Sequence, residues 1–376
     1  MIAVMRRILV LVVLVSAVWL PSARAAAADQ SGQTQPAPAG LAVDGDGNVY
    51  VSDYALDRLI KFGPDGSDLA QWGSSGNGLG QFNAPFGVAL DEHNTLYVVD
   101  QLNNRLQRFG PDGSALATWG AAGAGASELR TPFGVAVGGG RVYVADFGND
   151  RVQVYGSDGS LVATLGARGS GDGQFLRPAG VALAPDGSLY VTDHFNDRVE
   201  RFSGDGRFQA QLGTLQLTAA GPAGAALSAT AVSAATASAA ATLTIVPGPT
   251  VVLTTTPTAV TTPQPTPSPS PTVLAAALPD AQLRRPEGIA VDRDGNLWVA
   301  DYGRDRVVKL APDGRLLLSW GSRGSGPGEF LGPKGVAIDP SSGRLYVADT
   351  GNGRVQRFGP DGTPEAIWQL PNPPNP

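Results

Sequence analysis

The chain of 376 residues has no cysteine, only two histidines and fewer basic than acidic side chains. Without cysteine it can form neither a disulfide nor a lipid anchor through a thiol, so it can occupy an oxidising compartment without using it. Its 27 Lys and Arg against 33 Asp and Glu give a net charge of −6. Nucleic-acid binding depends on clustered basic side chains that neutralise phosphates, so we expect no nucleic-acid partner.

What the chain does contain is one pattern written six times, about 47 residues apart except for one long gap. Each copy opens on Pro-x-Gly, continues through Asp-Gly-Asn-Leu-Tyr-Val-Ala-Asp and Asn-x-Arg-Val-x-Arg-Phe, and closes on Pro-Asp-Gly-Ser and Trp-Gly. The copies begin at Pro38, Pro85, Pro132, Pro178, Pro286 and Pro333. A repeat of this length with several short strands is typical of a propeller blade.

The fifth copy shows the expected strands of one blade. Apolar or alternating runs cover residues 288–292, 297–301, 306–310 and 316–320, and turn residues such as Gly295 and Asn296 separate them. Because no helical periodicity intervenes, the pattern predicts four antiparallel strands per copy. The fold class is therefore all-β, a six-bladed β-propeller built from four-stranded antiparallel blades. Whether residues 29–37 add a strand to close the ring, or packing alone closes it, stays open.

Two positions match the taper of a wedge-shaped blade, narrow at the hub and wide at the rim. The middle of the first strand is always alanine: Ala42, Ala89, Ala136, Ala182, Ala290 and Ala337. The fourth strand ends on a bulky residue: Trp72, Trp119, Leu165, Leu212, Trp320 and Trp368.

An aspartate and an arginine five positions later recur most strictly. The pairs are Asp53/Arg58, Asp100/Arg105, Asp146/Arg151, Asp193/Arg198, Asp301/Arg306 and Asp349/Arg354. Six equivalent copies indicate architecture rather than catalysis. We expect each aspartate to accept loop N–H groups while the arginine pairs with it across the turn.

The copies resemble NHL repeats, most clearly along residues 333–339 and 345–358. The family's asparagine after the strand-ending aspartate is kept at Asn103, Asn149, Asn196 and Asn352, whereas Leu56 and Arg304 depart from it. The resemblance implies a six-bladed propeller. It implies no single activity, because the family includes lyases, sensor domains, RNA-binding modules and interaction scaffolds.

The termini and the long gap have their own composition. Residues 1–25 resemble a secretory signal peptide, with Arg6 and Arg7 before an apolar stretch and an Ala-x-Ala site at its end. Residues 26–37 form a linker, 38–213 hold blades one to four and 280–368 hold blades five and six. Residues 214–279 carry no charge and are rich in Ala, Thr and Pro, and 369–376 are Pro-rich. We expect both of these last segments to be disordered.

Positions where the copies disagree are the candidates for ligand binding. One follows the shared aspartate and the other lies within Pro-x-Gly; both belong to loops expected on one face around the central channel. Exposed aromatic side chains with a few polar groups suit sugars or peptides. The alternative is that Phe86 and Phe133 merely plug the channel entrance. The candidate residues are Tyr54, Phe86, Phe133, Phe147, His194, Phe195, Glu287, Tyr302, Arg304 and Lys334.

We expect no catalytic residue, metal or cofactor. The family's amidating lyases hold zinc with several histidines, but His93 and His194 belong to opposite ends of a blade. His194 as a catalytic base is the competing hypothesis. Lactonase-like propellers use carboxylates and asparagine around a calcium ion in the channel, and the nearest equivalents here end the first strand, where capping of the next turn is the alternative role. These residues are Asp44, Asp91, Asp292 and Asp339.

The sequence thus favours an exported scaffold, secreted, periplasmic or at the cell surface, that binds a protein, peptide or glycan without catalysis. Contact with the membrane would come only from an uncleaved signal. The alternative is a metal-assisted lyase or a lactonase-like enzyme using the channel. A third hypothesis is a sensory or adhesive module tethered through residues 214–279, which are otherwise a tolerated surface insertion.

Overall fold

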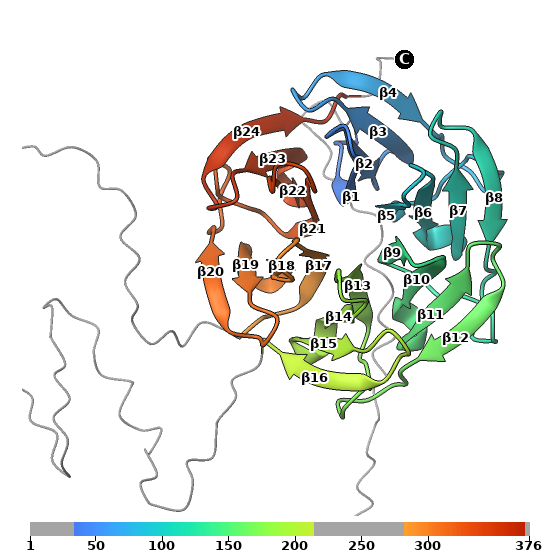
Figure 1. The fold of residues 1–376 in the computed structure, drawn as a ribbon. Helices are drawn as coiled ribbons and strands as arrows, with labels where there is room; N and C mark the ends of the chain where they lie inside the picture. Colours follow the sequence, from blue (N-terminus) through green and yellow to red (C-terminus); the bar gives the residue numbers. More distant parts are fainter. Residues whose placement is uncertain (1–33, 214–281, 373–376) are drawn as a thin grey trace, which may run out of the picture. The chain divides into compact units, whose positions relative to one another are not determined.

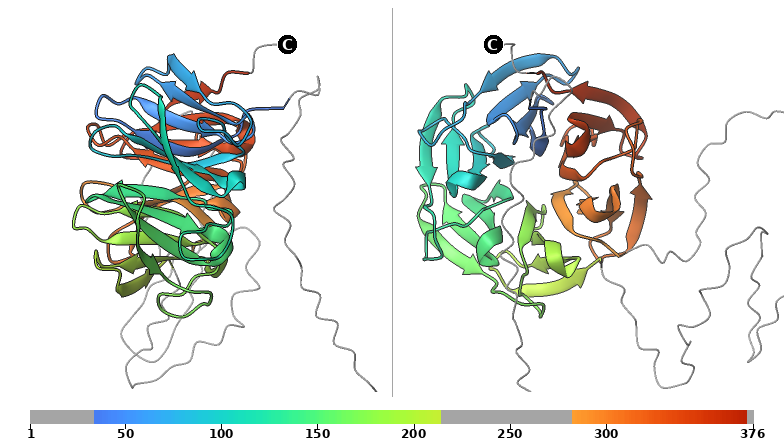
Figure 2. Two further views of the ribbon diagram at one scale, coloured as in Figure 1. Left: turned by 90° about the vertical axis from the view of Figure 1, so that its right-hand side faces the viewer. Right: turned by 180° about the vertical axis from the view of Figure 1, so that it is seen from behind.

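The computed structural model describes residues 34–213 and 282–372; the expected signal peptide and the whole of the uncharged insertion lie outside them. The described residues form six four-stranded antiparallel sheets, each built from four consecutive strands. The sheets are the blades of a six-bladed propeller, with the first strand of each at the hub and the fourth at the rim (Figure 1). The reverse view shows the same ring around one axis (Figure 2). The predicted fold class is confirmed.

The bounds of the elements follow the repeat. Blades one to three comprise β1 (Pro38–Val43), β2 (Val49–Asp53), β3 (Arg58–Phe62) and β4 (Asp68–Trp72); β5 (Pro85–Leu90), β6 (Leu96–Asp100), β7 (Arg105–Phe109) and β8 (Ala115–Trp119); β9 (Val135–Gly138), β10 (Arg141–Asp146), β11 (Arg151–Gly156) and β12 (Leu161–Leu165). Blades four to six comprise β13 (Pro178–Leu183), β14 (Leu189–Asp193), β15 (Arg198–Phe202) and β16 (Phe208–Leu212); β17 (Pro286–Val291), β18 (Leu297–Asp301), β19 (Arg306–Leu310) and β20 (Leu316–Trp320); β21 (Pro333–Ile338), β22 (Leu345–Asp349), β23 (Arg354–Phe358) and β24 (Pro364–Gln369).

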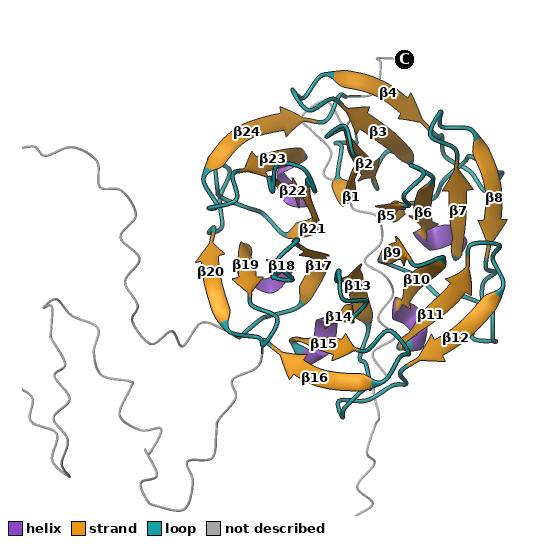
Figure 3. Cartoon of the chain, viewed as in Figure 1, coloured by secondary structure: helices purple, strands orange, loops and turns teal. Residues whose placement is uncertain are grey.

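Short 3-10 helices, which the repeat did not predict, join the second strand to the third in five blades (Figure 3). A further local irregularity is a bulge in the first strand of five blades, for example between Pro286 and Ile289. Such a bulge re-aims the side chain beside it. The helices are η1 (Gln101–Asn103), η2 (Phe147–Asn149), η3 (His194–Asn196), η4 (Tyr302–Arg304) and η5 (Thr350–Asn352).

The Pro-x-Gly glycines let neighbouring blades approach closely at the hub. A Cβ on the Pro-x-Gly glycine Gly40 would lie 2.1 Å from the carbonyl oxygen of Phe86 in the next blade, closer than any real Cβ contact. Every blade repeats this relation with its successor. The glycines are Gly40, Gly87, Gly134, Gly180, Gly288 and Gly335, and their partners are the carbonyls of Phe86, Phe133, Ala179, Glu287, Lys334 and Ala39.

The rim is interlocked in the same direction. Trp72 at the end of blade one covers Gly113 in the Pro-Asp-Gly turn of blade two, where a Cβ would lie 1.6 Å from the indole Nε1. Trp119, Leu165, Leu212, Trp320 and Trp368 cover the corresponding glycines of the blades that follow them. The bulky residue of one blade thus needs the glycine of the next.

Each aspartate of the Asp/Arg pairs connects three segments. In blade five, Asp301 is fully buried, its Oδ1 accepts the backbone N–H of Arg284, and its Oδ2 accepts Nε of Arg306 at 2.7 Å. Arg306 in turn donates to the carbonyl of Gln282. Burial raises the pKa of Asp301, against the lowering effect of the bonds from Arg284 and Arg306. The other five pairs have the same Nε–Oδ2 contact, at 2.7–3.0 Å.

The seam between the last and first blades contains no exchanged strand among the described residues. Packing closes it instead, including residues just after β24. Arg58, whose counterparts donate to blade connectors, donates here to the carbonyl of Pro371. Leu370 is only 5% exposed and joins the core beside Phe62. Leu370 and Pro371, which were expected to belong to a disordered tail, thus contribute to the packing at the seam.

Candidate ligand site at the hub

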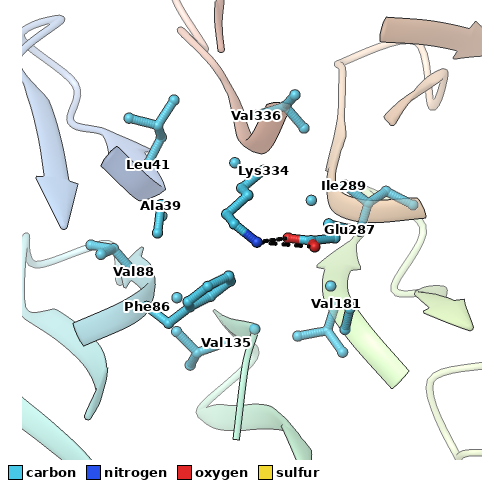
Figure 4. Close-up of a pocket in the computed structure, with 17 residues that line it drawn as sticks. Ala39, Leu41, Phe86, Val88, Val135, Val181, Glu287, Ile289, Lys334 and Val336 are labelled. Atoms are coloured by element: carbon cyan, nitrogen blue, oxygen red, sulfur yellow. Dashed lines mark hydrogen bonds and ion pairs between the residues drawn. The ribbon is translucent and has the colours of Figure 1, made fainter. Parts of the chain in front are cut away.

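The first strands of all blades line an axial cavity of about 70 Å³ (Figure 4). Most of its wall is aliphatic side chain or glycine, because each blade presents the same positions of its first strand. Among the lining residues only Glu287 and Lys334 are charged. Both occupy the variable position of Pro-x-Gly, Glu287 on β17 and Lys334 on β21, and Figure 4 shows them pointing toward each other.

The two charged groups form a close ion pair. Lys334 Nζ lies 3.1 Å from Glu287 Oε1 and 3.0 Å from Oε2. The glutamate side chain is 5% exposed and the lysine side chain 18%. Burial is the largest single influence and would lower the pKa of Lys334, but the Glu287 carboxylate, together with Tyr302 and Tyr54, more than offsets it and raises that pKa above its ordinary value. The ammonium is thus charged at neutral pH.

Aromatic rings surround the same point. The ammonium of Lys334 lies 4.8 Å from the ring centre of Tyr302 and 5.3 Å from that of Phe86. Phe86 also contacts Tyr54 edge-on at 6.4 Å and Phe133 at 4.5 Å. Cations are attracted to the faces of aromatic rings, so these groups form one electrostatic unit with the ion pair.

The aromatic contacts continue through blades three to five. Phe133 stacks on Phe147 at 4.0 Å, Phe147 meets His194 edge-on at 5.9 Å, and His194 lies 6.3 Å from Tyr302. Phe195 packs edge-on against His194 at 4.8 Å. The structure thus brings nine of the ten candidate residues into one contact group. Arg304 is half-buried at the end of η4.

Burial divides the candidate residues, which were expected to be exposed. Phe147 is 2% exposed, His194 7% and Phe86 9%, whereas Phe195 reaches 36%. For Phe147 and His194 the cause is the 3-10 turn, whose first residue is tucked inward in η2 and η3. Tyr54, Phe133, Tyr302 and Lys334 are half-buried. The arrangement is an inward-facing mouth rather than a flat aromatic surface.

His194 belongs to the wall of this mouth. Its Nδ1 lies 3.3 Å from the carbonyl of Pro286, which can only accept, so Nδ1 is the donor. Burial lowers the pKa of His194, against the raising effect of Glu287. The ring is therefore neutral at pH 7 and leaves Nε2 as an acceptor.

The aspartates that end the first strands cap the following turns. Asp292 Oδ1 accepts the backbone N–H groups of Asp294 and Asn296, and Asp44, Asp91 and Asp339 make equivalent bonds. His93 is exposed in the turn after Asp91, away from the hub. Across residues 34–213 and 282–372, no group of three or more His, Cys, Asp or Glu is placed to hold a metal ion.

Two further sets of residues position the elements around the hub: one that the sequence did not single out, and one that it singled out without assigning a role. The residue after each η turn has positive φ, and after η1 to η4 its side chain bonds the entry to the next blade, as Asp197 Oδ1 does when it accepts the N–H of Arg285 next to Pro286. After η5 the residue is Gly353, which has no side chain. The repeated asparagines bridge blade and connector, as Asn196 does between Asp193 and Gly169. The position just before the repeated arginine holds Asp or Asn in five of the six copies, and this recurrence was the available signal for the first set.

The hub and its six blades define the class of this molecule as a six-bladed β-propeller. The NHL repeat profile matches residues 129–155, 283–310 and 330–358. The chain is an NHL-repeat propeller. In the described residues, no helix has the length and apolar character needed to cross a bilayer.

Curated relatives match only locally. Peptidylglycine alpha-amidating monooxygenase of Rattus norvegicus is 41% identical over 63 residues, which is 15% of this chain and 6% of that protein. Among solved structures, virginiamycin B lyase from Staphylococcus aureus superposes with a TM-score of 0.52 at 12% identity, covering 89% of this chain and 85% of that one. A gluconolactonase from Xanthomonas campestris gives 0.51 at 16% identity, covering 84% of each. At such identities the likeness concerns the fold alone.

Proposed function

We propose that this NHL-repeat propeller is an exported, non-catalytic scaffold that binds its ligand at the mouth of the hub. The observation that carries the proposal is the Glu287–Lys334 pair, held at 3.0 Å inside an otherwise apolar cavity and faced by aromatic rings. Concave, mostly apolar sites with a few convergent polar groups are the usual form of small-ligand sites. The export part rests on residues 1–25, which have the composition of a secretory signal.

Rigidity of the surrounding ring supports a binding role. The glycine contacts at the hub fix the spacing of neighbouring blades, and the Asp/Arg pairs tie each connector to its blade. A site assembled from several such blades loses little conformational freedom when a ligand enters, which favours affinity. The ligand is a small molecule, or an end or side chain of a larger partner, because the cavity is small.

The competing proposal is a metal-assisted lyase or lactonase acting in the channel. Its support is that a lyase and a gluconolactonase share the propeller fold. Plasma mass spectrometry on the purified mature protein after gentle dialysis separates the two proposals. One calcium or zinc per chain would favour the enzyme, and we expect none at stoichiometry.

A thermal-shift screen tests the binding proposal directly. Neutral sugars, short peptides and small charged metabolites are added to the wild-type protein and to the double variant Glu287→Gln/Lys334→Met. We expect at least one compound class to raise the Tm of the wild type only. If every hit stabilises both proteins equally, the hub is not the ligand site.

Export is tested by the N-terminus of the mature protein. Mass spectrometry of protein recovered from the culture medium or the cell envelope should show a chain that begins near residue 26. Recovery of the intact chain in the cytosol would contradict export.

A further inference from the structure

The variable positions of Pro-x-Gly differ sharply in character around the hub. Glu287 and Lys334 are charged, and they lie in adjacent blades. Their counterparts in the other four blades are Ala39, Phe86, Ala179 and the half-buried Phe133. The same backbone environment therefore accepts apolar residues, and nothing in the fold requires charge there.

Stability does not account for the pair. Taking a carboxylate and an ammonium out of water carries a large desolvation penalty, and replacing a buried pair by apolar residues is often neutral or stabilising. At this site the chain itself shows that alanine and phenylalanine fit. The pair is better explained by the chemistry of a ligand that meets it.

Charge balance selects the kind of ligand. A simple cation bound at Glu287 would leave Lys334 without its counter-charge, and a simple anion bound at Lys334 would do the same to Glu287. In each case one buried charge is left without a partner, which is strongly unfavourable. A molecule with one positive and one negative group can instead exchange partners with both side chains and leave no net charge behind.

The aromatic walls add a preference for an organic ammonium. Tyr302 and Phe86 already present their faces to the ammonium of Lys334, at 4.8 and 5.3 Å. A ligand ammonium that takes the place of this group beside Glu287 gains the same attraction. Lys334 has a flexible four-carbon stem, so its ammonium can follow the ligand's carboxylate without a backbone change.

Resting on the proposed function of the hub, we propose that its ligand is a small zwitterion of the betaine or amino-acid class. Its ammonium pairs with Glu287 between Phe86 and Tyr302, and its carboxylate pairs with Lys334. The bound ligand separates the 3.0 Å ion pair and inserts both of its charges between the two side chains.

Calorimetric titration with three near-isosteric probes tests this assignment. Glycine betaine carries both charges, choline lacks the carboxylate, and 3,3-dimethylbutyrate replaces the ammonium nitrogen by carbon. We expect glycine betaine to bind at least about tenfold more tightly than either analogue. Equal or tighter binding of an analogue overturns the proposal. So does a failure to bind by both glycine betaine and β-alanine, a second zwitterion that is titrated in the same way.

Matched variants locate the binding. Glu287→Gln and Lys334→Met should each weaken binding of glycine betaine at least about tenfold, with the folded state checked by circular dichroism. Lys309→Met is the control, because Lys309 has a similar environment outside the cavity. Its ammonium pairs with the carboxylate of Asp292 at 3.1 Å and lies 4.4 Å from the ring centre of Trp298. This substitution should leave binding unchanged. Equal losses in Lys309→Met and Lys334→Met would count against the hub assignment.

The swapped variant Glu287→Lys/Lys334→Glu keeps both charges and offers a second check. We expect it to recover binding relative to Glu287→Lys alone, because a zwitterion can turn round between the exchanged partners. No recovery in a folded protein would contradict partner exchange. A neutral sugar or peptide bound at the hub in place of a zwitterion would overturn this inference while sparing the proposed function. If no ligand of any class binds at the hub, both the zwitterion inference and the proposed function are wrong.

Discussion

A Cβ placed on Gly335 would lie 2.1 Å from the carbonyl oxygen of Ala39, which joins the last blade to the first. The five other neighbouring pairs of blades make the same contact between a hub glycine and a carbonyl. The seam is therefore built like every other blade interface, although its two sides are about 300 residues apart in the chain. Close packing at this contact holds the ring closed, and no strand is shared between the last and first blades among the described residues.

Gly335→Ala should destabilise the protein by about 1–3 kcal/mol, because the added methyl group forces the two blades apart at the hub. Gly45→Ala is the control, since a Cβ at Gly45 meets nothing within 4 Å. It should change the free energy of unfolding by less than about 0.5 kcal/mol. Urea unfolding followed by tryptophan fluorescence measures both. Equal stability of the two variants would mean that the hub contact is not tight.

A chain that ends at Gln369 should be less stable than one that ends at Asn372. It loses the buried side chain of Leu370, a contribution of about 1.5–3 kcal/mol, and leaves Arg58 without the carbonyl of Pro371. The Tm of the two truncated proteins gives the comparison. Identical Tm values would show that residues 370–372 do not hold the seam.

Asp301→Ala should lower the free energy of unfolding by about 3–5 kcal/mol, because it leaves the guanidinium of Arg306 buried without its carboxylate. The backbone N–H of Arg284 loses its acceptor as well. Glu92→Ala removes an exposed carboxylate and should change little. A stable Asp301→Ala protein that had lost only ligand binding would contradict a structural role for the Asp/Arg pairs.

The strands could be predicted because turn residues mark their ends in every copy. In blade five, β18, β19 and β20 have the predicted bounds, and β17 begins only two residues before the predicted run. The contact between Glu287 and Lys334 could not be predicted in the same way. It depends on which blades are neighbours and on the bulge after Pro286, which turns the residue beside it. Likewise, the burial of Phe147 follows from a 3-10 turn that no periodicity revealed.

Glu200 should make stability depend on pH. It lies on β15, fully buried, where three other blades have glutamine, and burial raises its pKa to about 8. Between its ordinary value of 4.5 and about 8 the folded protein holds a proton that the unfolded chain has released. The contribution of Glu200 to the free energy of unfolding is therefore fully present below pH 4.5 and is lost as the pH rises toward 8.

Glu200→Gln should remove that dependence. Its side chain should bond as Gln356 does in blade six, where Nε2 donates to the carbonyl of Glu329 and to Asp349. The gain over the wild type should be on the order of 3 kcal/mol at pH 9 and much smaller at pH 5. Urea unfolding at the two pH values measures it. A constant difference between the proteins from pH 5 to pH 9 would contradict the raised pKa.

The most direct test of the ligand site is a crystal structure of the wild-type propeller grown with glycine betaine. We predict electron density for the ligand in the hub cavity, between Glu287 and Lys334, with the two side chains farther apart than 3.0 Å. Ligand density elsewhere on the propeller, with the ion pair intact, would contradict it.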